Sequence, residues 1–125
     1  MSSVLIVEDD DDSREALSLF LRQKGHQVEA VRNGKDALAA ILTDMPDVVL
    51  LDLFLPEVDG PSVLEVVRSY LRLQSLPVVI MTALPDSPMV ERARHLKVNA
   101  ILVKGRASLE DVHRAVEEAS SRLPT

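Results

Sequence analysis

Three short stretches of this sequence are continuously apolar, and each of them ends abruptly in a polar residue. The stretches are Val4 to Val7, Val48 to Leu51 and Val78 to Met81. A strand with one face in water alternates apolar and polar residues, whereas a strand that is buried on both faces does not. The chain is therefore expected to form a parallel sheet whose two faces are both covered by helices.

Segments with helical spacing separate these runs from one another. We predict strands at roughly residues 3–7, 27–31, 47–52, 77–82 and 99–103. Helices are predicted to begin at an Asp12–Glu15 capping box, Asn33–Gly34, Gly60–Pro61, Ser87–Pro88 and Ser108. Strands that alternate with helices in this way predict an α/β fold of (βα)5 type, doubly wound through right-handed crossovers.

Composition narrows both the architecture and the function. The 125 residues suit a single domain spanning 1–125, and 46% hydrophobic residues suffice for its core. The net charge of −6 argues against direct binding to nucleic acid, and the absence of cysteine excludes disulfides and thiolate metal sites. Because no apolar run approaches the roughly 18 residues of a membrane span, we expect a cytoplasmic protein without membrane attachment.

Polar side chains follow four of the predicted strands at the point where each strand ends. Glu8 and Asp9 follow the first strand, Asp52 ends the third, Thr82 the fourth, and Lys104 follows the fifth. In doubly wound sheets, ligands bind beyond the carboxyl ends of the strands. Carboxylates, a hydroxyl and an ammonium group at this edge predict a site for Mg²⁺ and a phosphoryl group.

The residue types suggest individual roles. Asp9 and Asp52 are expected to bind Mg²⁺, with Glu8 holding a metal-bound water and the backbone carbonyl of Phe54 as a further ligand. An aspartate can also attack phosphorus and form an aspartyl phosphate. Taken singly, each residue has an ordinary structural explanation, such as a helix cap, a turn, a strand end or a surface lysine. The joint pattern carries the prediction.

The motif set resembles the receiver domain of two-component response regulators, the CheY-like family. The resemblance covers essentially the whole chain and rests on Val4 to Asp10, Asn33 to Leu38, Asp52 to Gly60, Thr82–Ala83 and Lys104. It implies a flavodoxin-like sandwich with a five-stranded parallel sheet of order 2-1-3-4-5.

The resemblance also implies a function. Asp52 would be the phospho-acceptor, taking a phosphoryl group from a histidine kinase or phosphotransfer protein in a Mg²⁺-dependent reaction. Thr82 and Lys104 would be the switch and phosphate contacts, and Ala83 would join the cofactor-binding part of the site. The fourth helix, fifth strand and fifth helix would dock a downstream effector protein or a second copy in a phosphorylation-dependent homodimer. Such a domain catalyses only its own phosphoryl transfer and slow autodephosphorylation, so it is not expected to be an enzyme.

Four positions depart from the family pattern. Gly105 replaces the proline that usually follows the lysine in a cis peptide, and we predict a trans bond because a cis bond costs about 3–4 kcal/mol here. Ile101 replaces a Tyr or Phe and is predicted to pack on the fourth helix. Phe54 and Leu84 stand where polar side chains are common, and are predicted to slow the attack of water on the phosphorylated state.

Alternatives to the phospho-acceptor remain. Gly105 and Ile101 favour a receiver fold that acts as a phosphorylation-independent interaction module. A Mg²⁺-dependent phosphohydrolase usually needs a second aspartate two residues after the nucleophile, where this chain has Phe54. A flavin-binding domain would need a Ser-, Thr- or Gly-rich loop after the first strand, where this chain has an acidic run.

Overall fold

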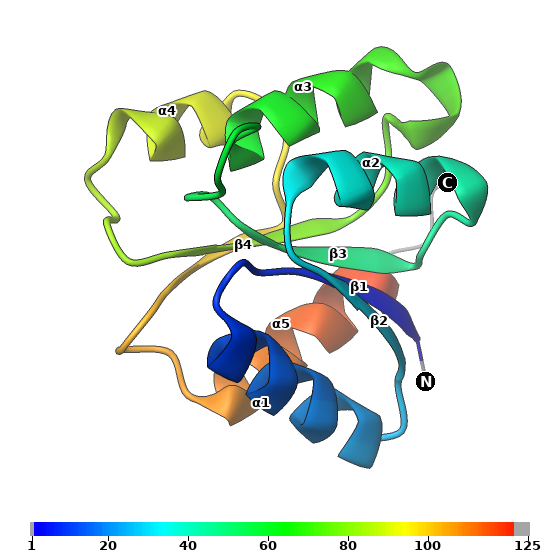
Figure 1. The fold of residues 1–125 in the computed structure, drawn as a ribbon, viewed down its shortest axis with the longest axis vertical. Coiled ribbons are helices and arrows are strands. Elements are labelled where there is room, and N and C mark those ends of the chain that lie inside the picture. The colour runs from blue at the N-terminus through cyan, green and yellow to red at the C-terminus, as the bar shows by residue number, and fades with distance from the viewer. Residues whose placement is uncertain (1, 122–125) are drawn as a thin grey trace.

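The computed structural model describes residues 2–121 and forms one parallel sheet covered on both faces by helices (Figure 1). The sheet has the strand order β2-β1-β3-β4-β5, which confirms the predicted fold class. Along the chain the elements are β1 (Ser3–Val7), α1 (Asp11–Gln23), β2 (Gln27–Val31), α2 (Gly34–Thr43), β3 (Val48–Asp52), α3 (Gly60–Ser69), the 3-10 turn η1 (Leu71–Leu73), β4 (Val78–Thr82), α4 (Pro88–Arg94), β5 (Ala100–Val103) and α5 (Leu109–Ser121).

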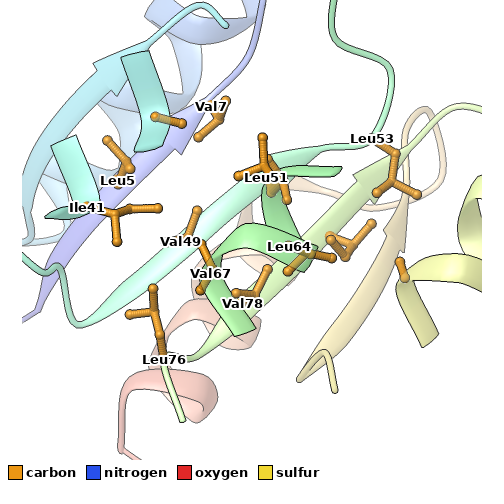
Figure 2. Packing of buried hydrophobic residues seen from close by; sticks show 14 of the residues in the cluster. Leu5, Val7, Ile41, Val49, Leu51, Leu53, Leu64, Val67, Leu76 and Val78 are labelled. Carbon is orange, nitrogen blue, oxygen red and sulfur yellow. The ribbon is translucent and has the colours of Figure 1, made fainter. Parts of the chain in front are cut away.

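Helices α1 and α5 cover one face of the sheet, and α2, α3 and α4 cover the other (Figure 1). Each central strand contributes side chains to both layers, because successive residues of a strand point to opposite faces of the sheet. Leu5 of β1 packs in the α2–α3–α4 layer with Val49 and Leu64 (Figure 2). Its neighbour Ile6 packs in the α1–α5 layer. The continuously apolar runs are therefore explained by burial on two faces.

Most helices begin where the sequence predicts. The side chains of Asn33, Asp59 and Ser87 accept hydrogen bonds from the first turns of α2, α3 and α4. Ser108 and Asp111 bond each other's backbone N–H groups at the start of α5.

The predicted Asp12–Glu15 capping box at the first helix is wrong. The cap is Asp10, whose carboxylate accepts a hydrogen bond from the Ser13 backbone N–H at 2.8 Å. Asp10 keeps an extended backbone, with φ −75° and ψ 119°, as an N-cap residue must. Asp11 and Asp12 then fall in the first turn, where negative charge favours the helix dipole.

The start of α3 lies directly against the end of β3. A Cβ atom added to Gly60 would come within 2.7 Å of the Cα atom of Leu53 and 2.9 Å of the carbonyl oxygen of Asp52. Only glycine allows this approach, and it places the residues after Asp52 in a compact turn. Within residues 2–121, none of the helices has the length and apolarity needed to span a membrane.

Candidate functional site

Three carboxylates meet at the carboxyl edge of the sheet. Glu8 and Asp9 follow β1 and Asp52 ends β3, and one oxygen from each lies within 4.8 Å of the others. Glu8 and Asp52 are only 2% and 5% exposed, whereas Asp9 is open to solvent. Like charges this close repel each other, so the cluster needs a cation. Carboxylate oxygens are the ligands that Mg²⁺ prefers, and the donor set therefore fits this ion.

Lys104 supplies one positive charge to this cluster. Its Nζ atom lies 2.7 Å from Glu8 Oε1 and 3.0 Å from Asp52 Oδ2. Burial alone would lower the pKa of Lys104, but its hydrogen bonds to Glu8 and Asp52 and their charges outweigh burial and raise the pKa. The lysine is therefore held in its charged form between two buried acids.

Thr82 and the turn after Asp52 complete the edge of the site. Thr82 ends β4, is fully buried, and accepts a hydrogen bond from the backbone N–H of Leu84 at 3.1 Å. Its carbonyl oxygen accepts from the backbone N–H of Lys104 at 2.8 Å, which joins the ends of β4 and β5. The backbone N–H of Phe54 donates to Asp52 Oδ1 at 3.2 Å, and Ala83 is exposed beside Thr82. The predicted residues are thus gathered at one edge, and their individual roles stay predictions.

Arg14 also supports this site, and the sequence reasoning missed it. Its guanidinium donates to the carbonyl oxygens of Glu8 at 3.0 Å and Asp9 at 3.5 Å, and it pairs with the carboxylate of Asp11. Arg14 thereby fixes the turn that presents the two acids. The available signal was a single arginine two residues after an acidic run, a pattern too common to single out.

The departures at Gly105 and Ile101 have simple structural outcomes. The Lys104–Gly105 peptide is trans as predicted, since residues 2–121 contain no cis bond. Gly105 has a φ of +87°, in the left-handed region, and a Cβ atom there would meet nothing within 4 Å. Ile101 is half-buried and packs against the core cluster to which Val90 and Ala93 of α4 belong, so its side chain faces the layer in which the fourth helix lies.

Two arginines connect α4 to α3. Arg92 of α4 reaches Asp59 Oδ2 at 3.4 Å and Glu65 Oε1 at 2.6 Å. In the opposite direction, Arg68 of α3 donates to the carbonyl oxygens of Leu96 at 2.8 Å and Lys97 at 2.7 Å, just after α4. The position of α4 is therefore set largely by α3, whose first turn adjoins Asp52.

Comparison with known proteins decides the family. The family model of the response regulator receiver domain matches residues 4–117. The chain belongs to this family. As a receiver domain it is not an enzyme in the conventional sense.

Curated relatives of this receiver domain are regulatory proteins. It is 41% identical over 86 residues to the transcriptional regulatory protein AfsQ1 of Streptomyces coelicolor, an alignment that covers 69% of this chain and 37% of AfsQ1. The chain thus spans little more than a third of that relative's length. It is 35% identical over 123 residues to the probable methanogenesis regulatory protein FilR2 of Methanothrix harundinacea, covering 92% of this chain and 79% of FilR2.

Solved receiver structures share the fold closely. The receiver domain of a signal transduction histidine kinase from Syntrophus aciditrophicus superposes with a TM-score of 0.88 at 26% identity, covering 100% of this chain and 96% of that one. The Mn²⁺-bound form of the response regulator Rcp1 superposes with a TM-score of 0.80 at 27% identity, again covering 100% and 96%. A receiver of this fold can therefore hold a divalent cation, and this chain has an acidic cluster suited to one.

Proposed function

We propose that this receiver domain is a phospho-acceptor switch of a two-component system, with Asp52 as the acceptor. The observation that carries the proposal is the position of Asp52: its buried carboxylate lies within reach of two further acids and of the Lys104 ammonium. A histidine kinase or a phosphotransfer protein would supply the phosphoryl group. We assign residues 1–125 to one receiver domain. We further propose that this domain acts in the cytoplasm and does not bind nucleic acid directly.

The reaction assigned to Asp52 is a displacement at phosphorus. A carboxylate oxygen forms the new P–O bond while the P–N bond of the donor's phosphohistidine breaks, and the electron pair stays with the imidazole nitrogen. Lys104 would neutralise charge on the transferring group. When bound by Asp9, Asp52 and the carbonyl of Phe54, with Glu8 holding a coordinated water, Mg²⁺ would neutralise further charge on the phosphoryl oxygens.

The switch would follow from a change of partners at the strand ends. A phosphoryl group adds roughly two negative charges and new acceptor oxygens beside Lys104. Lys104 would turn from Glu8 toward the phosphoryl oxygens, with Ala83 contributing its backbone beside them. The Thr82 hydroxyl would also turn toward the phosphoryl oxygens. The loop that contains Leu84 would move with it, because the Leu84 backbone N–H donates to this hydroxyl. The α4–β5–α5 surface would then change its affinity for a downstream effector protein or a second copy of the chain.

A second candidate is a phosphorylation-independent interaction module. Lys104 already satisfies Glu8 and Asp52, the Lys104–Gly105 bond is trans, and Ile101 has no ring to swing between two positions. These features favour a surface that binds partners without a phosphoryl signal.

A magnesium titration tests the first proposal. Asp9→Asn removes one charge from the cluster, whereas Asp12→Asn removes one charge from the nearby first turn of α1. We expect Mg²⁺ affinity, measured by calorimetry, to fall severalfold in Asp9→Asn and to stay near the wild-type value in Asp12→Asn. Equal affinities in both variants would contradict the metal assignment.

A further inference from the structure

A hollow of about 200 Å³ lies at the amino edge of the sheet, opposite the edge that carries Asp52. The end of α3 and the two loops that lead into β4 and β5 form its walls, with the lining residues Arg68, Gln74, His95, Leu96 and Lys97. This lining contains an arginine, a lysine and a histidine but no carboxylate, in a chain whose net charge is −6. The hollow is therefore a cationic site on an acidic protein.

Arg68 brings a half-buried positive charge to this hollow. Its guanidinium donates to four carbonyl oxygens, those of Leu73 at 3.0 Å, Leu76 at 2.9 Å, Leu96 at 2.8 Å and Lys97 at 2.7 Å. A guanidinium has five N–H donors, so these four bonds leave one for a ligand. Carbonyl groups carry only partial charges, and burial lowers the pKa of Arg68. A bound anion would stabilise this charge, because it would supply the full negative charge that the carbonyls lack.

The same four bonds make the hollow a preformed site. They hold the loop before β4 and the loop before β5 on one side chain, so neither loop has to be ordered when a ligand binds. Lys97 has a φ of +61°, a left-handed conformation that is unfavourable for a residue with a Cβ atom, and the Arg68 bond to its carbonyl oxygen helps to hold it. An anion would therefore enter at a small entropic cost.

The acids of the neighbouring helices do not neutralise this site. Glu65 and Glu91, the single acids of α3 and α4, pair with arginines of α4 at 2.6 and 3.6 Å. Among residues 2–121, no acidic side chain forms an ion pair with Arg68, His95 or Lys97. The side chains of His95 and Lys97 are exposed at the rim, where they can meet a ligand from outside the molecule.

An exposed leucine stands beside the cationic hollow. Leu71 is 84% exposed, the highest value among the large apolar side chains of residues 2–121. The backbone N–H of Gln74 donates to the Leu71 carbonyl oxygen and closes the 3-10 turn η1. Side chains three residues apart in a 3-10 turn lie one above the other, so Leu71 shares the face on which Gln74 lines the hollow. The surface thus combines an apolar contact with adjacent positive charge.

We propose that Arg68, Leu71 and Lys97 mark a docking surface for an acidic segment of a partner protein. A carboxylate of the segment enters the hollow, and a neighbouring apolar side chain covers Leu71. Charge complementarity favours this occupant over a second copy of the chain, whose net charge of −6 opposes association. Nucleic acid would need an extended basic face, which a single hollow does not supply. Because the surface lies opposite Asp52, docking does not depend on the phospho-acceptor assignment.

A short peptide tests this docking surface on the full chain. The probe is a capped Gly-Ser-Glu-Leu-Ser-Gly peptide, and the control peptide has Gln in place of Glu. In proton–nitrogen NMR, the probe should shift the amide signals of Arg68, Gln74 and Lys97 in a saturable way, whereas the control peptide should bind severalfold more weakly. Added salt should weaken the probe, because it screens charge interactions at exposed sites.

Substitutions separate docking from general attraction. Lys97→Gln and Leu71→Ser change exposed side chains, so the fold should be kept, and each should weaken probe binding severalfold. Lys35→Gln on α2 and Leu19→Ser on α1 also change exposed side chains but should bind the probe as the wild type does. Asp52→Asn should likewise bind normally, so that docking and the phospho-acceptor assignment fail independently.

Three results would overturn the docking surface. The first is equal binding of the probe and the control peptide, or no binding of either. The second is an equal loss of probe binding in Lys97→Gln and Lys35→Gln, which would show attraction without a defined site. The third is tighter binding of inorganic phosphate alone than of the probe, which would make the hollow a site for a small anion.

Discussion

The Nζ atom of Lys104 lies 2.7 Å from Glu8 Oε1, closer than its 3.0 Å distance to Asp52 Oδ2. The lysine thus bridges the acid that follows β1 and the acid that ends β3, and it supplies a positive charge to the acidic cluster. Any divalent cation bound there would share these carboxylates with Lys104.

Lys104→Met should therefore lower stability strongly without metal and only slightly with it. Without Mg²⁺, removing one partner of a buried ion pair is expected to lower the free energy of unfolding by about 3 kcal/mol. With saturating Mg²⁺, most of this loss should be recovered, because a bound ion stabilises the folded state. Denaturation in EDTA and in Mg²⁺ measures both values. Arg106→Met removes an exposed charge from the same loop and should show neither effect.

Gly105 should matter for its backbone conformation. An alanine in the left-handed region costs about 1 kcal/mol, and Gly105 lies there with a φ of +87°. Gly25 makes a matched control, because it has a φ of +96° and equally open space around it but lies far along the chain from the site.

Both Gly105→Ala and Gly25→Ala should lose similar stability in thermal melts, but only Gly105→Ala should change the rate of phosphorylation. A change of equal size in Gly25→Ala would show that the rate merely follows stability. Gly105→Pro should be more damaging than either, since proline fixes φ near −65°. The proline that is usual in the family therefore does not fit this loop.

Arg92 should restrain α4. Arg92→Gln removes its contacts with Asp59 and Glu65, which connect α4 to the first turns of α3. We expect amide exchange within α4 to become severalfold faster, with little change in Mg²⁺ binding. Arg94→Gln removes a charge from the same helix, where Arg94 pairs with its neighbour Glu91 at 3.6 Å. If both variants exchange equally fast, the connection to α3 does not restrain the helix.

Acid should weaken the start of α3. Burial alone would raise the pKa of Asp59, but hydrogen bonds from Ser62 and the charge of Arg92 outweigh it and lower the pKa. A lowered carboxyl pKa means that the stabilisation is complete above the usual value of 3.8 and is lost as the pH falls below it. Asp59→Asn, which keeps a capping side chain, should flatten this part of the stability profile between about pH 5 and pH 2.

Phe54 and Leu84 should protect the phosphorylated state. Both side chains are exposed beside the site, at 37% and 57%, so a polar replacement at either should leave stability nearly unchanged. We expect the double variant Phe54→Asn, Leu84→Asn to lose its phosphoryl group severalfold faster, as followed by intact mass over time. Leu19→Asn changes an exposed leucine on α1 and serves as the control. If the double variant loses its phosphoryl group at the wild-type rate, Phe54 and Leu84 do not protect the phosphorylated state.

The features of the fold that depend on short-range sequence patterns were predicted correctly. The strands, the starts of α2 to α5 and the gathering of Glu8, Asp52 and Lys104 at one edge follow from apolar runs, capping residues and the rule for parallel strands. The connections between layers were not predictable in this way. The hydrogen bond between His26 and His113 joins positions 87 residues apart, and the Arg92 contacts span 33 and 27 residues, with no periodic signal in the sequence.

The first helix shows the same limit at short range. The sequence offers a capping box at Asp12, but the cap is Asp10, and the turn before it is held by the contacts of Arg14 with Glu8 and Asp9. Several adjacent acids can each cap a helix equally well on local grounds. Which one does so was decided here by the neighbouring backbone.

The most direct test of the central claim is the intact mass of the domain after incubation with Mg²⁺ and a small acyl-phosphate donor. Wild type should gain one phosphate, as should Asp86→Asn, which changes an exposed aspartate in the loop before α4. Asp52→Asn should remain folded and gain none. An adduct that persists in Asp52→Asn, or no adduct on a wild-type domain shown to bind Mg²⁺, would contradict the assignment of Asp52 as the phospho-acceptor.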